Sequence, residues 1–189
     1  GLVEEIAKRE LDQFKNVISR IVSFDTPELK LLKAWQQFVE GKDKEAEAAC
    51  QELLNTHFRD NDRVHYLLAI IYQKRMNFDS AVEQMNLAID KRSNFPLYYI
   101  ERALLHFSMN NYENALADIS FAASSNPENP FVFLAKTRIY FGLWSKMHWG
   151  YDKYDPNKYK EYLRELEAAA TRAYELLPDS IVVLCSLGC

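Results

Sequence analysis

The sequence predicts an all-α fold made of short helices that follow one another closely. Apolar residues recur at the spacings of three and four that place them on one face of a helix. The six prolines fall between such segments, and no Asn-Gly or Asp-Gly turn between alternating apolar residues signals a strand pair. We therefore expect helices over residues 2–24, 28–40, 43–57, 62–75, 78–91, 96–109, 112–125, 130–145, 157–177 and 180–188.

Proline or glycine marks most of the boundaries between these helices, because proline cannot continue a helix and glycine readily ends one. These boundary residues are Pro27, Gly41, Pro96, Pro127, Pro130, Pro156 and Pro178. The first helix carries Ile6, Phe14 and Val17 on one side and ends shortly before Pro27. We expect residues 1–26 to form an N-terminal helix, either a cap or the second helix of a degenerate repeat.

A short segment recurs at a fixed spacing. Phe78-Asp79-Ser80-Ala81 returns 34 residues later as Tyr112-Glu113-Asn114-Ala115. Small residues around these segments would let two helices approach closely, namely Ala69, Ala81, Ala88, Ala103, Ala115 and Ala122. Larger residues would fill the space between successive helix pairs, namely Tyr72, Phe78, Met85, Tyr112 and Ile119. The chain therefore reads as a series of helical hairpins.

This pattern of small residues, aromatics and a closing proline resembles the tetratricopeptide repeat. The resemblance implies a right-handed α-α superhelix, a solenoid of about four helix-turn-helix repeats. It places a repeat domain over residues 27–189. Its units are expected at about 28–61, 62–95, 96–129 and 130–179, followed by a truncated unit at 180–189. An array that stops within a unit suggests a piece of a longer protein.

Two units depart from the pattern. In the first, bulky Trp35 stands at a position where the repeat has a small residue. The fourth is longer than the others, since Pro178 follows Pro127 at 17 residues more than the repeat length. We assign the extra length to an insertion at about 145–159 and to a longer second helix.

The resemblance also indicates where a partner would bind, because the first helix of each hairpin lines the inner face of such a solenoid. The predicted groove residues are Leu32, Gln36, Arg63, Tyr66, Ile70, Gln73, Ile100, Leu104, Phe107, Leu134, Arg138 and Phe141. Leu97 and Phe131 stand at inner positions as well. This strip is largely apolar, which favours a peptide or helix with spaced hydrophobic anchors. The alternative is that the strip is covered by the N-terminal helix or by chain beyond Cys189.

Aromatic residues are concentrated in the insertion. Trp144, Trp149, Tyr151 and Tyr154 form a possible second contact site, because Trp and Tyr are enriched in binding hot spots. The alternative is that these rings pack back onto the neighbouring helices. The acidic residues nearby lack the spacing and the glycine of an EF-hand, so no calcium site is expected.

Some relatives in this family hold the C-terminal carboxylate of heat-shock chaperones through lysine, asparagine and arginine. The matching positions here are Leu32, Gln36, Leu67, Leu97 and Glu101. A carboxylate would meet hydrocarbon and a like charge at these positions. A partner of the heat-shock-chaperone carboxylate-clamp type is therefore not expected.

Composition excludes other classes of partner. The formal charge of −4 offers no basic excess for nucleic acid or for an anionic membrane. Three cysteines without CxxC spacing indicate neither a disulfide scaffold nor a zinc site. A chain without a disulfide scaffold fits a reducing compartment, so we expect a soluble protein of the cytoplasm. We predict no cofactor, no metal and no catalytic residue. His106 falls at an aromatic core position and Cys50 on a buried helix face, so both read as packing residues.

The sequence thus predicts a non-enzymatic protein-protein interaction module, a scaffold or adaptor whose partner is a protein or peptide. Two alternatives stay open. The chain could be the substrate-recruiting repeat region of a larger multidomain enzyme, or a structural scaffold that associates with itself.

Overall fold

The structure, a computed structural model, describes residues 26–56 and 61–178, and within them it contains helices and no strands. The helices are α2 (Pro27–Val39), α3 (Asp43–Thr56), α4 (Asp62–Lys74), α5 (Phe78–Lys91), α6 (Pro96–Ser108), α7 (Tyr112–Ser125), α8 (Pro130–His148) and α9 (Pro156–Leu176). The predicted all-α class is confirmed, and the bounds agree with prediction to within one residue except at the end of α8.

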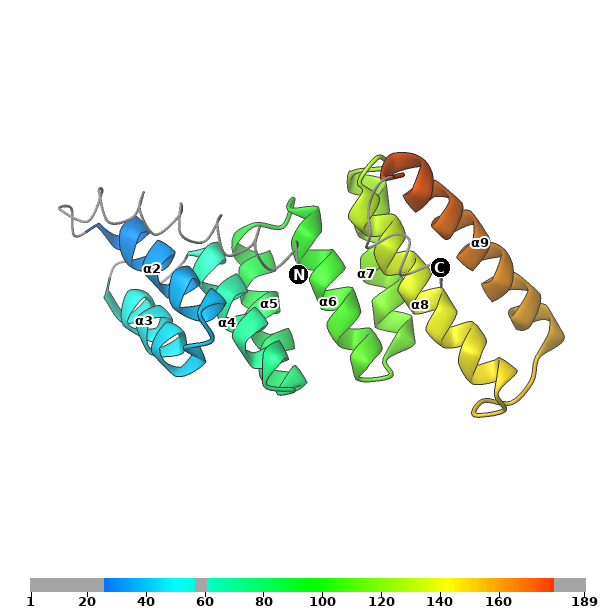
Figure 1. The fold of residues 1–189 in the computed structure, drawn as a ribbon, viewed down its shortest axis with the longest axis horizontal. Helices are drawn as coiled ribbons and strands as arrows, with labels where there is room; N and C mark the ends of the chain where they lie inside the picture. The colour runs from blue at the N-terminus through cyan, green and yellow to red at the C-terminus, as the bar shows by residue number, and fades with distance from the viewer. Residues whose placement is uncertain (1–25, 57–60, 179–189) are drawn as a thin grey trace, which may run out of the picture. The chain divides into compact units, whose positions relative to one another are not determined.

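The described residues fall into two compact units that divide after Lys91. In the first unit, α2 pairs with α3 and α4 pairs with α5; in the second, α6 pairs with α7 and α8 pairs with α9. Each pair is a helical hairpin, and Figure 1 shows the two ribbons of each hairpin side by side. The predicted helices over 2–24 and 180–188, and with them the N-terminal cap and the truncated last unit, lie outside the described residues.

Several helices begin at a side chain that accepts a hydrogen bond from the first turn, which satisfies an otherwise unpaired backbone amide. Thr26 caps α2, and the Asn61 carboxamide accepts from the Arg63 amide at 2.9 Å at the start of α4. Asp155 caps α9 by accepting from the amides of Asn157 and Lys158. A proline follows the caps of α2 and α9 at the first helical position, where no amide hydrogen is needed.

The first helix of each hairpin ends in the same way. A residue with positive φ follows the helix, and the amide after it donates back over the last turn, which is the Schellman arrangement. At the end of α4 the Asn77 amide donates to the Tyr72 carbonyl at 3.0 Å. The positive-φ residues are Gly41, Met76, Asn110 and Gly150. The repeat seen in the sequence therefore corresponds to hairpins whose four chain reversals share the same backbone geometry.

The core of the first unit joins α2, α3 and α4. Ala34, Ala46 and Cys50 are fully buried there, and Leu53 and Val64 pack with them. Burial raises the pKa of the Cys50 thiol to about 12, so it remains protonated and acts as a small apolar side chain. The bulky Trp35 is half-buried against this core, with its ring centroid 6.1 Å from Phe38 and 5.9 Å from Tyr66.

The core of the second unit joins α6, α7 and α8. Ala103, Ala115 and Ala122 have no exposed surface, as expected of the small residues that allow close helix approach. Ile119 and Ile139 fill the space beside them. A hydrogen-bonded ion pair adds to this packing, because Arg102 on α6 donates to Asp118 on α7 at 2.6 and 2.8 Å.

The end of α8 differs from the prediction. We expected this helix to stop near residue 145 and the following residues to form an insertion, but α8 continues for almost another turn to His148. The extra turn is stabilised by the burial of Met147 and by Lys146, which donates to Asn110 at 2.6 Å. The irregular connection to α9 is accordingly shorter than predicted. No helix in the described part of the chain is both long and apolar enough to cross a bilayer.

Candidate functional site

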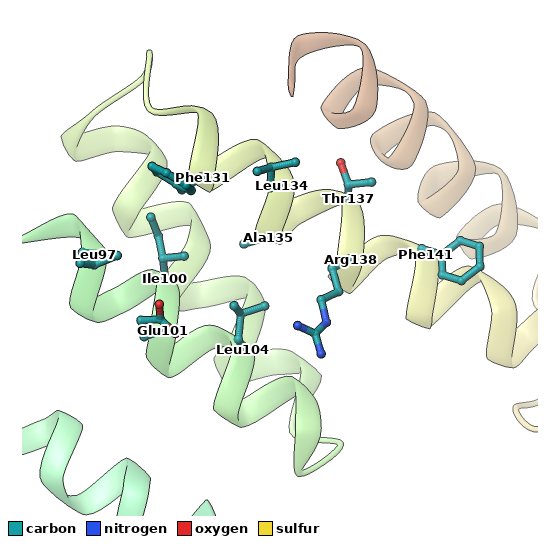
Figure 2. Close-up of a pocket in the computed structure, with 10 residues that line it drawn as sticks. All are labelled: Leu97, Ile100, Glu101, Leu104, Phe131, Leu134, Ala135, Thr137, Arg138 and Phe141. Carbon is teal, nitrogen blue, oxygen red and sulfur yellow. The ribbon is translucent and has the colours of Figure 1, made fainter. Parts of the chain in front are cut away.

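A groove in the second unit lies between α6 and α8, the first helices of its two hairpins. Its volume is about 670 Å³, and Figure 2 shows its two walls facing each other. The wall from α6 consists of Leu97, Ile100, Glu101 and Leu104, and the wall from α8 of Phe131, Leu134, Ala135, Thr137, Arg138 and Phe141. The groove is thus built from apolar side chains with one acid and one base.

Helical periodicity explains why these side chains share one surface. On α6, Leu97, Glu101 and Leu104 are spaced by four and three residues, which places them on one face. Phe131, Leu134, Arg138 and Phe141 follow the same spacing on α8. The two helices approach closely because Gly142 on α8 lies directly under the ring of Phe107 on α6.

The residues that line the groove differ in how far their side chains are exposed to solvent. Phe131 and Phe141 are 58% and 54% exposed, so both rings of the α8 wall present apolar surface to solvent. Leu104 and Leu134 are half-buried, and Ile100 is only 3% exposed and belongs to the core. A ligand would therefore contact the two phenylalanines and the leucines, with Ile100 forming the floor.

Glu101 and Arg138 are the charged residues of the groove. Burial raises the pKa of the Glu101 carboxyl group above its usual range, and the positive charge of Arg138 offsets this effect only in part. Within the part of the chain that the structure describes, neither side chain makes a hydrogen bond or an ion pair. In Figure 2 the Arg138 side chain extends from α8, while Glu101 stands in the opposite wall next to Ile100.

Seven of the residues predicted at inner positions line this groove: Leu97, Ile100, Leu104, Phe131, Leu134, Arg138 and Phe141. Phe107, predicted with them, is not in the lining. Its ring instead packs over Gly142 and against Tyr112, with ring centroids 5.8 Å apart, and it joins the core of the second unit. The missing side chain of Gly142 leaves the space that the Phe107 ring fills.

Glu101 was named from the sequence at a carboxylate-clamp position but was not included among the predicted groove residues. Its position one turn after Leu97 and just before Leu104 was the available signal. Ala135 and Thr137 were also missed, since both are buried small residues that contribute only to the groove wall.

The other predicted groove residues belong to the first unit. Leu32 and Gln36 lie on α2, where Leu32 is 38% exposed and the Gln36 side chain donates to Glu40 at 3.0 Å. Those on α4 are exposed or half-buried: Arg63, Tyr66, Ile70 and Gln73. Leu67, by contrast, is completely buried and is not available to a ligand.

The aromatic residues predicted as a second contact site divide into two groups. Trp144 is half-buried on α8, and its ring stacks on His148 with centroids 4.7 Å apart. Trp149, Tyr151 and Tyr154 follow in the connection and are exposed at 72%, 81% and 59%. These exposed rings stand next to the end of α8 and present an apolar surface to solvent.

The histidine on α6 lies near an aspartate of α7. His106 is half-buried on α6, with its Nε2 atom 4.0 Å from the Asp118 carboxylate. Burial lowers the pKa of the His106 ring, against the opposing effect of Asp118, and thereby favours the neutral form of this half-buried side chain. Among the residues that the structure describes, no three histidine, cysteine or acidic side chains are grouped to hold a metal ion.

Several solved structures are similar to this one. A crystal structure of MamA matches with a TM-score of 0.66 at 13% sequence identity, over 91% of this chain and 94% of that chain. YrrB, a TPR protein with an unusual peptide-binding site, matches with a TM-score of 0.64 at 14% identity, over 97% of this chain and 86% of that chain. A tetratricopeptide repeat protein from Parabacteroides merdae matches at 0.66 and 15%, over 97% and 67%.

These likenesses confirm the fold predicted from the sequence. The chain is an all-α helical-repeat solenoid of the tetratricopeptide type. At sequence identities of this size the comparison concerns the fold alone. No protein-family model and no curated protein matches the sequence.

Proposed function

We propose that this chain is a non-enzymatic protein-interaction module, a scaffold or adaptor, whose groove between α6 and α8 binds a peptide or helix of a partner protein. The observation that carries the proposal is the exposure of Phe131 and Phe141 on the α8 wall of an otherwise apolar groove. Large apolar side chains exposed together mark interaction surfaces, because their contact with water is unfavourable.

The dimensions of the groove support a peptide ligand. Its volume of about 670 Å³ falls within the range of clefts that enclose a ligand, and it is open along α6 and α8. An amphipathic helix or an extended segment could place successive apolar anchors against Leu104 and Leu134. The likeness to YrrB, whose description includes a peptide-binding site, supports the same class of ligand.

The proposal extends to two further surfaces. The predicted residues of the first unit, from Leu32 to Gln73, are a separate candidate surface for a protein partner. At the C-terminal end of the α8 wall, Phe141 contacts Trp144 at a centroid distance of 5.9 Å, so the half-buried member of the predicted second contact site adjoins the groove. The acidic composition favours a protein partner over nucleic acid or membrane, and we propose the cytoplasm as the location.

A selection experiment tests the proposal. The full chain is used to select binders from a phage library of random peptides, and the binders are retested on the double variant Phe131→Asp, Phe141→Asp. Both residues are exposed, so the fold should survive, which circular dichroism checks. Phe121→Asp is the matched control, because Phe121 is 42% exposed on α7 and outside the groove.

We expect the selected peptides to bind the wild-type chain and the control, and to lose at least tenfold in affinity on the double variant. Binders that treat the double variant and the control alike would refute the groove as the working surface. Self-association, the rival function, would appear instead as a mass above that of one chain in light scattering.

A further inference from the structure

We propose that the partner segment carries a lysine or arginine, flanked by apolar anchors, whose positive charge pairs with Glu101 on the α6 wall. This inference rests on the function proposed above and names the chemistry of the ligand that the same groove would accept.

Glu101 lies on an apolar wall of the groove. It stands in the α6 wall directly after Ile100, which is 3% exposed, and three residues before half-buried Leu104. A carboxylate on an apolar surface loses part of its hydration and needs a compensating charge or hydrogen-bond donor. Among the described residues none supplies a hydrogen bond or ion pair to Glu101.

The base inside the groove does not pair with Glu101. Arg138 stands on the opposite wall and acts on Glu101 through space, yet no ion pair joins them. The pKa of the Glu101 carboxyl group remains raised despite this positive charge, so compensation is incomplete. A cation brought by a ligand would complete it, in surroundings where charge interactions are stronger than in water.

The different exposure of Glu101 and Arg138 favours a basic over an acidic ligand group. Arg138 is exposed and keeps its hydration, so it gains little from a ligand carboxylate. Such a carboxylate would also be repelled by Glu101. A lysine or arginine gains twice, because its aliphatic stem can pack on Leu97 and Leu104 while its charged end meets the Glu101 carboxylate.

The test compares the residues that the groove selects. Peptides are selected from the same phage library on the wild-type chain, on Glu101→Gln and on Glu113→Gln. The Glu101→Gln change keeps the shape of the side chain and removes its charge. Glu113→Gln is the matched control, since Glu113 is exposed on α7 outside the groove.

On the wild type and on the control we expect lysine and arginine to be enriched about fivefold at one position among apolar anchors. On Glu101→Gln this enrichment should fall to the level of the library. A second measurement does not depend on any variant of the chain: replacing the selected basic residue by norleucine should weaken binding to the wild type about tenfold, and to Glu101→Gln less than twofold.

The possible outcomes separate the two proposals. Peptides that depend on Phe131 and Phe141 but show no preference for a basic residue would overturn this inference and leave the proposed function standing. A basic preference that persists on Glu101→Gln would overturn it as well. If no peptide depends on the groove, or if a second copy of the chain occupies it, the proposed function fails and this inference fails with it.

Discussion

The contact between Gly142 and Phe107 leads to a prediction that can be worked out from the structure. A Cβ atom added at Gly142 would lie 2.3 Å from Cζ and 2.4 Å from Cε2 of the Phe107 ring. Carbon atoms pack at about 3.5–4.0 Å, so the ring would have to move by more than about 1 Å. Overpacking of this kind costs about 1–3 kcal/mol.

The same substitution also has a favourable effect, because alanine is better than glycine inside a helix by about 1 kcal/mol. Taking about 2 kcal/mol for the clash, we expect Gly142→Ala to lower the free energy of unfolding by about 1 kcal/mol. For a chain of this length that corresponds to a fall in Tm of about 2–4 °C. Urea and thermal unfolding followed by circular dichroism measure both quantities.

A second variant tests whether the clash with the Phe107 ring causes the loss of stability. In a Phe107→Leu background the clashing ring atoms are gone, so Gly142→Ala should become stabilising by up to about 1 kcal/mol. If Gly142→Ala alone stabilises the protein while Phe107 is present, the ring does not occupy this space. The assignment of Phe107 to the core, rather than to the groove, would then be refuted.

Three further predictions concern single sites in the same fold. Met76 has a φ of 61° and is 72% exposed, so Met76→Gly should stabilise by about 1 kcal/mol in urea unfolding, and no gain would contradict the strain. Asp118→Asn removes the charge that accepts two hydrogen bonds from Arg102 and should destabilise by about 2 kcal/mol in the same assay; an unchanged value would refute the pairing. The pKa of His106 is lowered from 6.5 by burial, so the unfolded chain binds the proton first and stability falls as the pH drops below 6.5. His106→Gln should make that decline shallower, and equal slopes for both proteins would contradict it.

Most of the helices could be predicted from the sequence because their limits are local. Proline and capping residues fix where they begin, and the apolar period fixes which face is buried. The end of α8 could not be predicted in this way. Its last turn is held by the burial of Met147 and by the contact of Lys146 with Asn110, which lies far away along the chain.

Only part of the candidate groove could be predicted, because repeat position reveals which helices line it but not how their side chains pack. Repeat position identifies the inner helices, which is why Leu104, Leu134 and Phe141 were found. Repeat position does not reveal that Gly142 opens a space for Phe107. Nor does it show that Glu101 lies on an apolar wall with no hydrogen bond or ion pair from the described residues, because that depends on which side chains face it from α8.

The most direct test of the groove as a binding surface is methyl NMR of the full chain during titration with a selected peptide. The account predicts that the methyl signals of Leu97, Leu104 and Leu134 shift most, because these side chains line the groove. The signals of Leu116 on the outer helix α7 should stay in place. Shifts concentrated on α7 or α9, with the three groove leucines unchanged, would contradict the account.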